Sequence, residues 1–321
     1  MNTNIEIPSL IDMGLILGSM SDLKRAYEQL KIGGFQRFIL LHAGEIDDEM
    51  LAHPSYLKNK FPGIIPAFHP LKNGKFHNFE LLHTDDATSH KLIFYSHTAH
   101  KSLHIAETYQ SMLKAHDYDA LYISFPHNKR LAADGVIHQG DMSFQMGLPG
   151  LSHLSESAVI SRDLELAHDI GVQLHFHQIS SKRSVHLIRQ AKKEGTNVTC
   201  GVSAGHLLYT HTNTSGFNKD FKFIPPLREE SDRLALIEGV QDGTIDTIST
   251  GHYNDNKSSI NYLRAPITSM RPEIIFKELH SNLVEKQIIE LQTLINLLAI
   301  NPRKILCIPM EATHHQDNTC G

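Results

Sequence analysis

The sequence predicts an α/β protein whose parallel strands close into a (β/α)₈ TIM barrel. Short apolar runs alternate with longer amphipathic stretches along the chain, as in strands joined by crossover helices. Eight such runs are present, and eight is the number of parallel strands that closes a barrel. A length of 321 residues allows one large domain or two ordinary ones.

The candidate strands are mostly continuous apolar runs, which is typical of strands buried on both faces. They cover residues 9–17, 37–41, 64–68, 92–95, 120–125, 172–179, 197–202 and 245–249. The candidate helices cover residues 22–32, 102–116, 156–170, 183–194, 229–240 and 287–300. Gly33, Gly171 and Gly195 stand just after three of these helices, where a left-handed residue is favoured. We expect a single domain over residues 1–310 and a flexible tail over residues 311–321.

Composition excludes several classes of function. The formal net charge is −5 and no run of basic residues occurs, so a binding surface for nucleic acid or anionic lipid is not expected. The three cysteines are too few for a disulfide framework. No basic and apolar leader and no run of about 18 apolar residues is present. These features favour a cytoplasmic protein whose partners are small molecules or other proteins.

Several segments, in order along the chain, identify a family. PSLIDM begins the first candidate strand, GGF precedes the second, and GVIHQGDMSFQMGLPG follows the fifth. The longest matches are LHFHQISSKRSVHLIRQAKKEGTNVTCGVSAGHLLYT and FIPPLREESDRLALIEGVQDGTIDTISTGH, and INLLAINPRKIL stands near the end. Together these segments resemble the dihydroorotases, amidohydrolase-superfamily enzymes that close carbamoyl aspartate to dihydroorotate in pyrimidine synthesis. The resemblance implies a barrel of the metal-dependent hydrolase type.

In that family a zinc site lies at the carboxyl ends of the strands, where bound water loses a proton and the substrate carbonyl is polarised. Carried over position by position, every expected ligand is missing here. The His-x-His pair falls on Gly14 and Ile16, the acidic or carboxylated-lysine ligand on Tyr95 or Ser96, the next two histidines on Phe125 and Gln178, and the aspartate on Gly251. The substrate-binding arginine falls on Gly18, and the asparagine before Pro-Pro-Leu-Arg falls on Ile224.

The framework of the family is nevertheless retained. The matching residues are Pro225, Pro226, Leu227, Arg228, Asp232, Arg233, Asp242, Gly243 and Asp246. This contrast predicts a degenerate homologue, a pseudoenzyme with no catalytic residues, metal or cofactor. The chain also begins close to the first strand and ends soon after INLLAINPRKIL, so we expect a barrel without the small β satellite domain of the family.

The 23 histidines provide the alternative, a relocated metal site. His175 and His177 share one face of a strand, but Gln178 holds the ligand position on the other face. Unless a bulge intervenes, we therefore expect both histidines to point outward as hydrogen-bonded structural residues; with a bulge they become possible pocket residues. A helical spacing relates His97, His100 and His104, which favours a solvated face. His252 is expected to line the pocket, and His127 and His138 to lie at the surface or at an interface.

The first hypothesis is therefore a non-catalytic chain that holds or regulates another enzyme within an oligomer. The resemblance implies aspartate carbamoyltransferase as the partner, because inactive dihydroorotase-like chains serve that enzyme as scaffolds. Residues 126–152 and 61–68 are the candidate contact surfaces. The alternative is an active cyclic amidohydrolase with zinc held by His97, His100, His175, His177 or His252. A regulatory binding module is disfavoured, because Gly18 and Ile224 cannot bind a substrate carboxylate.

Overall fold

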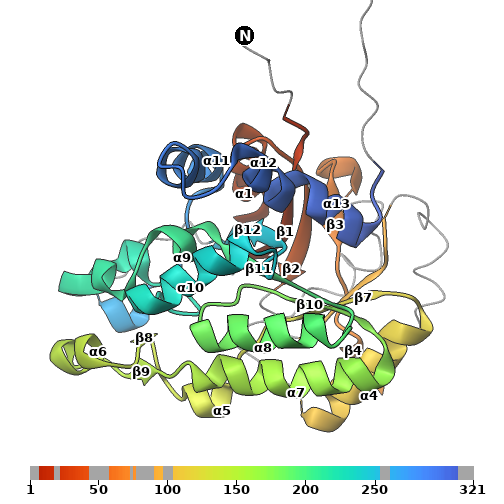
Figure 1. Ribbon diagram of the computed structural model, residues 1–321, viewed down its shortest axis with the longest axis horizontal. Helices are drawn as coiled ribbons and strands as arrows, with labels where there is room; N and C mark the ends of the chain where they lie inside the picture. The colour runs from red at the N-terminus through yellow and green to blue at the C-terminus, as the bar shows by residue number, and fades with distance from the viewer. Residues whose placement is uncertain are drawn as a thin grey trace, which may run out of the picture.

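The computed structural model describes residues 7–17, 22–42, 58–72, 75–76, 90–96, 104–253 and 261–309. Figure 1 shows the strands in the middle of the molecule with helices around them. Among the described residues, no helix combines the length and apolar character needed to cross a membrane.

The strands form two main parallel sheets. One has the order β13 (Gly251–Tyr253), β1 (Leu10–Leu17), β2 (Phe35–His42) and β3 (Ile64–Pro66). The other has the order β12 (Thr247–Ser249), β11 (Val198–Ser203), β10 (Gln173–Phe176), β7 (Leu121–Ser124) and β6 (Ile93–Tyr95). Two small pairs accompany them: β4 (Leu71–Lys72) with β5 (Lys75–Phe76), and β8 (Ile137–His138) with β9 (Gly150–Leu151).

The two main sheets adjoin at both of their edges. At one edge only Thr250 separates β12 from β13 along the chain. At the other edge, Phe68 forms a parallel bridge with Phe94, and its amide and carbonyl bond the carbonyl of Ile93 and the amide of Tyr95 at 3.0 Å each. The predicted α/β class with parallel strands is therefore confirmed. The strands form two adjoining sheets rather than one uninterrupted sheet, and closure into a barrel stays a prediction.

Each predicted strand overlaps an observed one. The largest difference is at β10, which ends at Phe176, whereas the apolar run continues to residue 179. Gln178 has a φ of +55°, a left-handed conformation that interrupts the alternation of a strand. This interruption changes which side chains face the interior.

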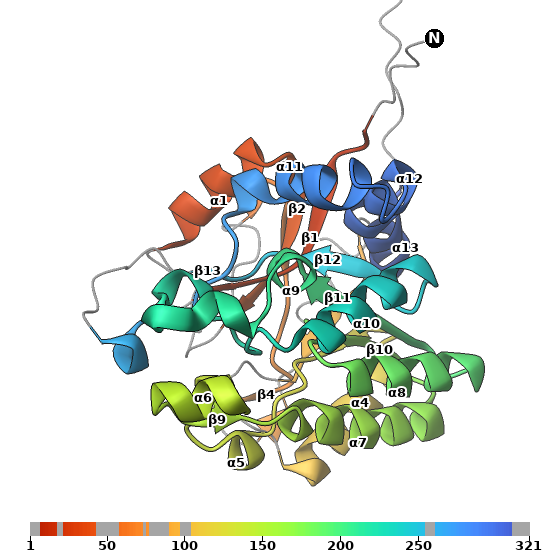
Figure 2. The same ribbon diagram turned by 60° about the vertical axis from the view of Figure 1, so that its left-hand side comes forward.

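The main helices lie outside the sheets (Figure 2). They are α1 (Leu23–Ile32), α4 (Ile105–Asp117), α7 (Leu154–Ile170), α8 (Lys182–Lys193) and α10 (Glu230–Gln241). Of the helix predicted over residues 287–300, residues 291–300 form α12 (Leu291–Ile295) and the π-helix η8 (Asn296–Ile300), and α13 (Asn301–Leu306) follows directly beyond the predicted end. Shorter elements are α5 (Lys129–Ala132), α6 (Asp141–Met146), α9 (Ala204–Leu208), α11 (Ile275–Leu279), the π-helix η7 (His280–Val284) and the 3₁₀ turns η3 (His211–Phe217), η4 (Lys219–Phe221), η5 (Tyr262–Arg264) and η6 (Pro272–Ile274).

Apolar side chains divide between the two faces of the strands. One cluster, which includes Phe38, Tyr122 and Phe176, packs between the strands and the helices. The other is called here the inner cluster and consists of Ile11, Met13, Ile16, Ile39, Leu41, Ile65, Ala67, Ile93, Tyr95, Leu121, Ile123, Phe125, Ile305, Leu306 and Ile308. The alternation of side chains along each strand produces this division. The inner cluster supports the candidate site.

The 61–68 segment is not an exposed contact surface. Phe61, Ile64, Ile65, Ala67 and Phe68 are all buried. That expectation was wrong because both faces of β3 are covered, so an apolar segment with no polar face is accommodated inside.

Candidate functional site

The candidate site lies where the resemblance places it, around β1, the ends of β7 and β10, and the β12–β13 junction. Gly14, in β1, faces the ring of His177, which follows β10. A Cβ atom at position 14 would overlap His177 Cε1 and would lie 2.7 Å from Nδ1. His177 is fully buried, and its ring centroid is 6.0 Å from that of Phe125. The imidazole of His177 therefore fills the space that a ligand at position 14 would need.

Gln178 fills a second such position. Gly251 has a φ of +83°, and a Cβ there would overlap the Gln178 amide, whose Cδ and Oε1 lie 2.8 and 2.9 Å from it. The Nε2 of Gln178 donates to Ser249 Oγ at 3.3 Å. Two positions where the family has ligands, 178 and 251, are thus in contact here, but one carries an amide and the other no side chain.

The other positions carry no imidazole or carboxylate. Ile16 and Phe125 are buried in the inner cluster, and Ile224 is half-buried against it. Ser96 is buried, and its hydroxyl accepts a hydrogen bond from the amide of Phe125 at 3.2 Å. Gly18 lies outside the described residues. These residues do not fit a zinc centre, because zinc in proteins takes thiolate, imidazole or carboxylate ligands.

The orientation expected for His175 and His177 was wrong, because both are directed to the inner side of the strands. His175 is paired in register with Ile123, a member of the inner cluster, and side chains opposite each other in a sheet share a face. The left-handed Gln178 then allows both His177 and Gln178 to turn inward. Sequence reasoning assumed a regular strand through residue 179 and so placed the histidines on the opposite face.

Both histidines are held neutral. Burial lowers the pKa of each to about 3. Thr199 Oγ1 lies 2.8 Å from His175 Nδ1 and 3.4 Å from the carbonyl oxygen of Leu174. Nε2 of His175 and both ring nitrogens of His177 have no hydrogen-bond partner among the described residues. A neutral imidazole with a free lone pair can ligate a metal ion.

The remaining candidate histidines do not join this pair in the described part of the chain. His104 is exposed at the start of α4. His97 and His100 lie outside the described residues, as does the side chain of His252, whose backbone is in β13. Over the described ranges, no group of three or more His, Cys, Asp or Glu side chains is placed to hold a metal ion.

Asp12 was not predicted as a site residue. Its carboxylate is fully buried beside Gly14 and accepts hydrogen bonds from the amides of Thr250 at 2.9 Å and Gly14 at 3.3 Å, and from the hydroxyl of Thr250. Burial raises its pKa to about 6, although these hydrogen bonds oppose the shift. The signal in the sequence was an acidic residue inside the apolar run PSLIDM. Asp12 connects β1 to the junction between β12 and β13 through its bonds to Thr250.

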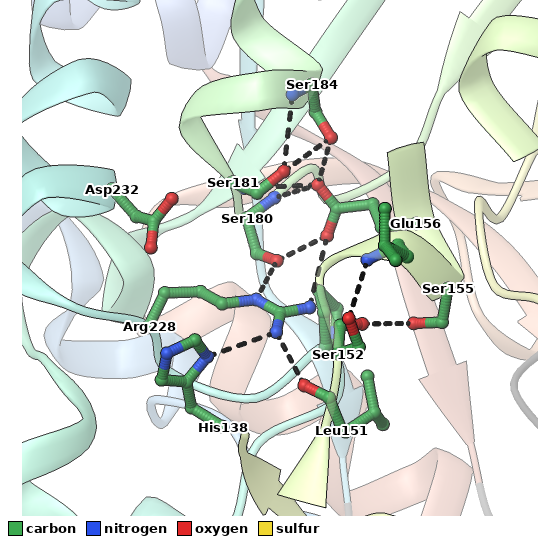
Figure 3. Close-up of polar contacts among 12 residues, drawn as sticks. His138, Leu151, Ser152, Ser155, Glu156, Ser180, Ser181, Ser184, Arg228 and Asp232 are labelled. Atoms are coloured by element: carbon green, nitrogen blue, oxygen red, sulfur yellow. Dashed lines mark hydrogen bonds and ion pairs between the residues drawn. The ribbon is translucent and has the colours of Figure 1, made fainter. Parts of the chain in front are cut away.

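A buried ionic network frames the site (Figure 3). Glu156 accepts hydrogen bonds from the amides of Ser180 at 2.9 Å and Ser181 at 3.1 Å, and from both the Ser180 and Ser184 hydroxyls. Arg228, from the retained PPLR motif, lies 3.9 Å from Glu156, and both side chains are almost inaccessible to solvent. The network therefore links the start of α7, the segment after β10 and the segment before α10.

The same arginine also holds the segment that follows β7. Arg228 donates from Nη1 to the carbonyl of Leu151 at 2.8 Å and lies 3.3 Å from His138 Nδ1. His138 is buried, and its pKa is lowered by burial and by the charge of Arg228. His127 is buried as well. The expectation of surface or interface positions for these two histidines was wrong, because the 126–152 segment packs against α7 and η3, with His138 beside Arg228 and His127 beside the ring of Phe125.

Comparison with known proteins shows which proteins the chain is similar to. No protein-family model matches the sequence. The chain is 36% identical to a dihydroorotase of Enterococcus faecalis over 199 residues, which are 61% of this chain and 47% of that protein. It is also 36% identical to a dihydroorotase of a Geobacillus species, over 63% of this chain and 48% of the relative. The chain thus spans about half the length of the curated relatives it matches.

Solved structures with a similar fold are hydantoinases. The D-hydantoinase of a Thermus species superposes with a TM-score of 0.74 at 15% identity, covering 93% of this chain and 70% of that one. The L-hydantoinase of Arthrobacter aurescens gives a TM-score of 0.74 at 20% identity over the same shares. The chain is therefore similar to dihydroorotases over about three fifths of its length, and its fold is that of the hydantoinases.

Proposed function

We propose that this chain is a non-catalytic dihydroorotase-like protein of pyrimidine biosynthesis, which acts in the cytoplasm as a structural or regulatory partner of aspartate carbamoyltransferase. Its 36% identity to dihydroorotases supports the pathway. The observation that carries the proposal is the packing of His177 against Gly14 and of Gln178 against Gly251. Side chains of this chain fill the space where the family would hold its metal.

We also propose that the two sheets form one closed eight-stranded barrel within a single domain over residues 1–310. The adjoining edges support closure, since β12 and β13 belong to different sheets but follow one another directly, and the Phe68–Phe94 bridge joins the other two edges. The hydantoinase superposition over 93% of the chain agrees with a single unit.

Catalysis is tested on the purified full chain. Cyclisation of carbamoyl aspartate is measured with stoichiometric zinc added, with the dihydroorotase of Enterococcus faecalis as the positive control, and metal content is measured on the protein as isolated. We expect no turnover above the buffer rate and less than a tenth of an equivalent of bound metal. Zinc-dependent turnover would overturn the non-catalytic proposal.

The partner is tested by co-expression with aspartate carbamoyltransferase from the same source, followed by size-exclusion chromatography. We expect co-elution. The 126–152 segment carries Phe144, whose side chain is 88% exposed, whereas Ile32 is a comparably exposed residue on α1, at 74%. Phe144→Ser should weaken co-elution if this segment is the contact, and Ile32→Ser should not. Separate elution of the two unaltered proteins would reject this partner.

A second candidate function is favoured by one observation: ring nitrogens of the buried His175 and His177 lack a hydrogen-bond partner within the described part of the chain. Under this alternative the pair contributes to a relocated metal site of an active cyclic amidohydrolase. It predicts bound zinc in the isolated protein, and loss of that zinc together with turnover in a His175→Gln, His177→Gln double variant. A metal-free, folded wild-type protein would reject it.

A further inference from the structure

A second concave site lies at the opposite ends of the strands. It is a pocket of about 440 Å³ beside the end of α1 and the beginnings of β2 and β3. Its lining consists of Lys31, Gln36, Arg37, Lys58, Pro62, Gly63, Ile64, Ile65 and His90. Three of these residues are cationic, and no Asp or Glu is among the described residues that line it. Such a concentration of positive charge is unexpected in a chain with a net charge of −5.

Arg37 is the most informative residue of the pocket. Its side chain is half-buried, and the structure gives it neither a hydrogen bond nor an ion pair with any other described residue. A partly buried guanidinium normally finds a carboxylate or carbonyl partner, because removing a charge from water is costly. The planar fork of N–H donors is thus available to a ligand that enters the pocket.

Lys31 adds a second positive charge, whose contacts in the described part of the chain are with oxygen dipoles and an aromatic ring. Its ammonium donates to the backbone carbonyl of Gln36 at 3.2 Å and to the Gln36 side-chain oxygen at 2.8 Å, and it lies 5.4 Å from the centre of the Tyr27 ring. These contacts position the ammonium without cancelling its charge. Partial burial lowers the pKa of Lys31, which shows that desolvation outweighs its favourable contacts.

We propose that this pocket binds the phosphate group of a small molecule, with Arg37 as the bidentate partner and Lys31 as a second positive charge. Arginine forms paired hydrogen bonds to phosphate oxygens, and lysine supports them as a point charge. A volume of 440 Å³ accommodates a phosphate group and leaves room for an attached organic group. The site is separate from the Gly14–His177 region, which lies towards the other ends of the strands, and it does not depend on the proposed function.

The test is isothermal titration calorimetry of the full chain with inorganic phosphate and, separately, with ribose 5-phosphate, at constant ionic strength maintained with sodium chloride. We expect saturable binding with one site per chain. If ribose 5-phosphate binds more tightly than inorganic phosphate, the ligand of the pocket is a phosphomonoester. If inorganic phosphate binds as tightly or more tightly, the ligand is the free phosphate ion. No saturable binding of either compound overturns the proposal.

Three variants make the test specific. Arg37→Gln should weaken binding at least about tenfold, because it removes a charge-assisted pair of hydrogen bonds, and Arg37→Lys should recover part of that loss. Lys24→Gln removes a charge from the exposed surface of α1 outside the pocket and should change affinity less than about twofold. Circular dichroism melting verifies that each variant is folded. Equal weakening by Arg37→Gln and Lys24→Gln would show a nonspecific charge effect and overturn the site.

Discussion

The energetic coupling between Gly14 and His177, which are in contact, can be measured by mutation. Gly14→Ala places a methyl group against His177 Cε1 and Nδ1, and His177→Ala leaves a cavity beside the same atom. Overpacking and cavity formation each destabilise a core, by about 1–3 and 2–5 kcal/mol respectively. In the double variant the new methyl occupies part of the cavity, so the two costs should not add.

We therefore predict a coupling energy of at least about 1 kcal/mol between positions 14 and 177 in a double-mutant cycle. The free energy of unfolding is measured by urea titration of the wild type, both single variants and the double variant. Additive effects would show that His177 does not occupy the space beside Gly14. That outcome would also remove the main support for a filled site.

Buried neutral histidines predict a steep loss of stability in acid. Burial lowers the pKa of His175 and His177 to about 3 and that of His206 to about 4, below the value of 6.5 for an exposed histidine. As the pH falls below 6.5, the unfolded chain binds protons that the folded chain does not. Each histidine then contributes a slope of up to about 1.4 kcal/mol per pH unit, with stability lost towards low pH. Asp12, with a raised pKa of about 6, opposes this trend between about pH 6 and 4.

His177→Leu should reduce the slope of unfolding free energy against pH by about 1.4 kcal/mol per unit between pH 6 and 5. His153→Gln, a change at an exposed residue before α7, should leave the slope as in the wild type. Urea titrations at half-unit steps of pH provide the measurement. An unchanged slope in His177→Leu would mean that His177 is accessible to protons in the folded state.

At the scale of elements, the Glu156–Arg228 network fixes three segments around the site. Arg228 reaches Leu151 in β9 and Ser180 after β10, and Glu156 belongs to α7. The negative charge of Glu156 is therefore compensated by the guanidinium of Arg228 and by hydroxyl and amide donors of the serines at and before the start of α8. Such an arrangement holds the 126–152 segment, which carries the exposed Phe144 on α6, through the bond from Arg228 to Leu151.

Arg228→Met should destabilise the protein by about 3–5 kcal/mol, because the buried Glu156 would lose its cation. Arg130→Met, at an exposed position on α5, should cost less than about 0.5 kcal/mol. The midpoint of chemical denaturation and limited proteolysis near residues 126–152 are compared for the two variants. A similar cost for both would indicate that Glu156 is satisfied by its serine and backbone donors alone.

At the scale of the whole molecule, the filled site predicts that folding is independent of metal. A structural or catalytic zinc ion would bind the folded state and raise its stability, so that a chelator would lower the melting temperature. We expect dialysis against EDTA to change the midpoint by less than about 1 °C, as measured by differential scanning calorimetry. A clear decrease, reversed by zinc, would favour the relocated site that includes His175 and His177.

The sequence by itself determined the order of the strands and helices, and it predicted the loss of the family ligands. Continuous apolar runs are local signals, and so are glycines that follow a helix, such as Gly171. Each can be recognised from a few consecutive residues, because those residues themselves are buried or adopt the required backbone conformation. The assignment of Gly14, Phe125, Gln178 and Gly251 to the ligand positions of the family rests on their motifs alone and stays a prediction. Likewise, the retention of Arg228 in PPLR was visible, although its buried partner Glu156 was not.

Only the tertiary structure decided how those positions are occupied. The inward direction of His177 depends on the left-handed φ of Gln178, and its contact with Gly14 joins residues 163 positions apart. The pocket around Arg37 likewise combines α1, β2 and the segments before β3 and β6. Periodicity within one segment cannot predict such contacts, because they depend on the packing of elements that are distant in the sequence.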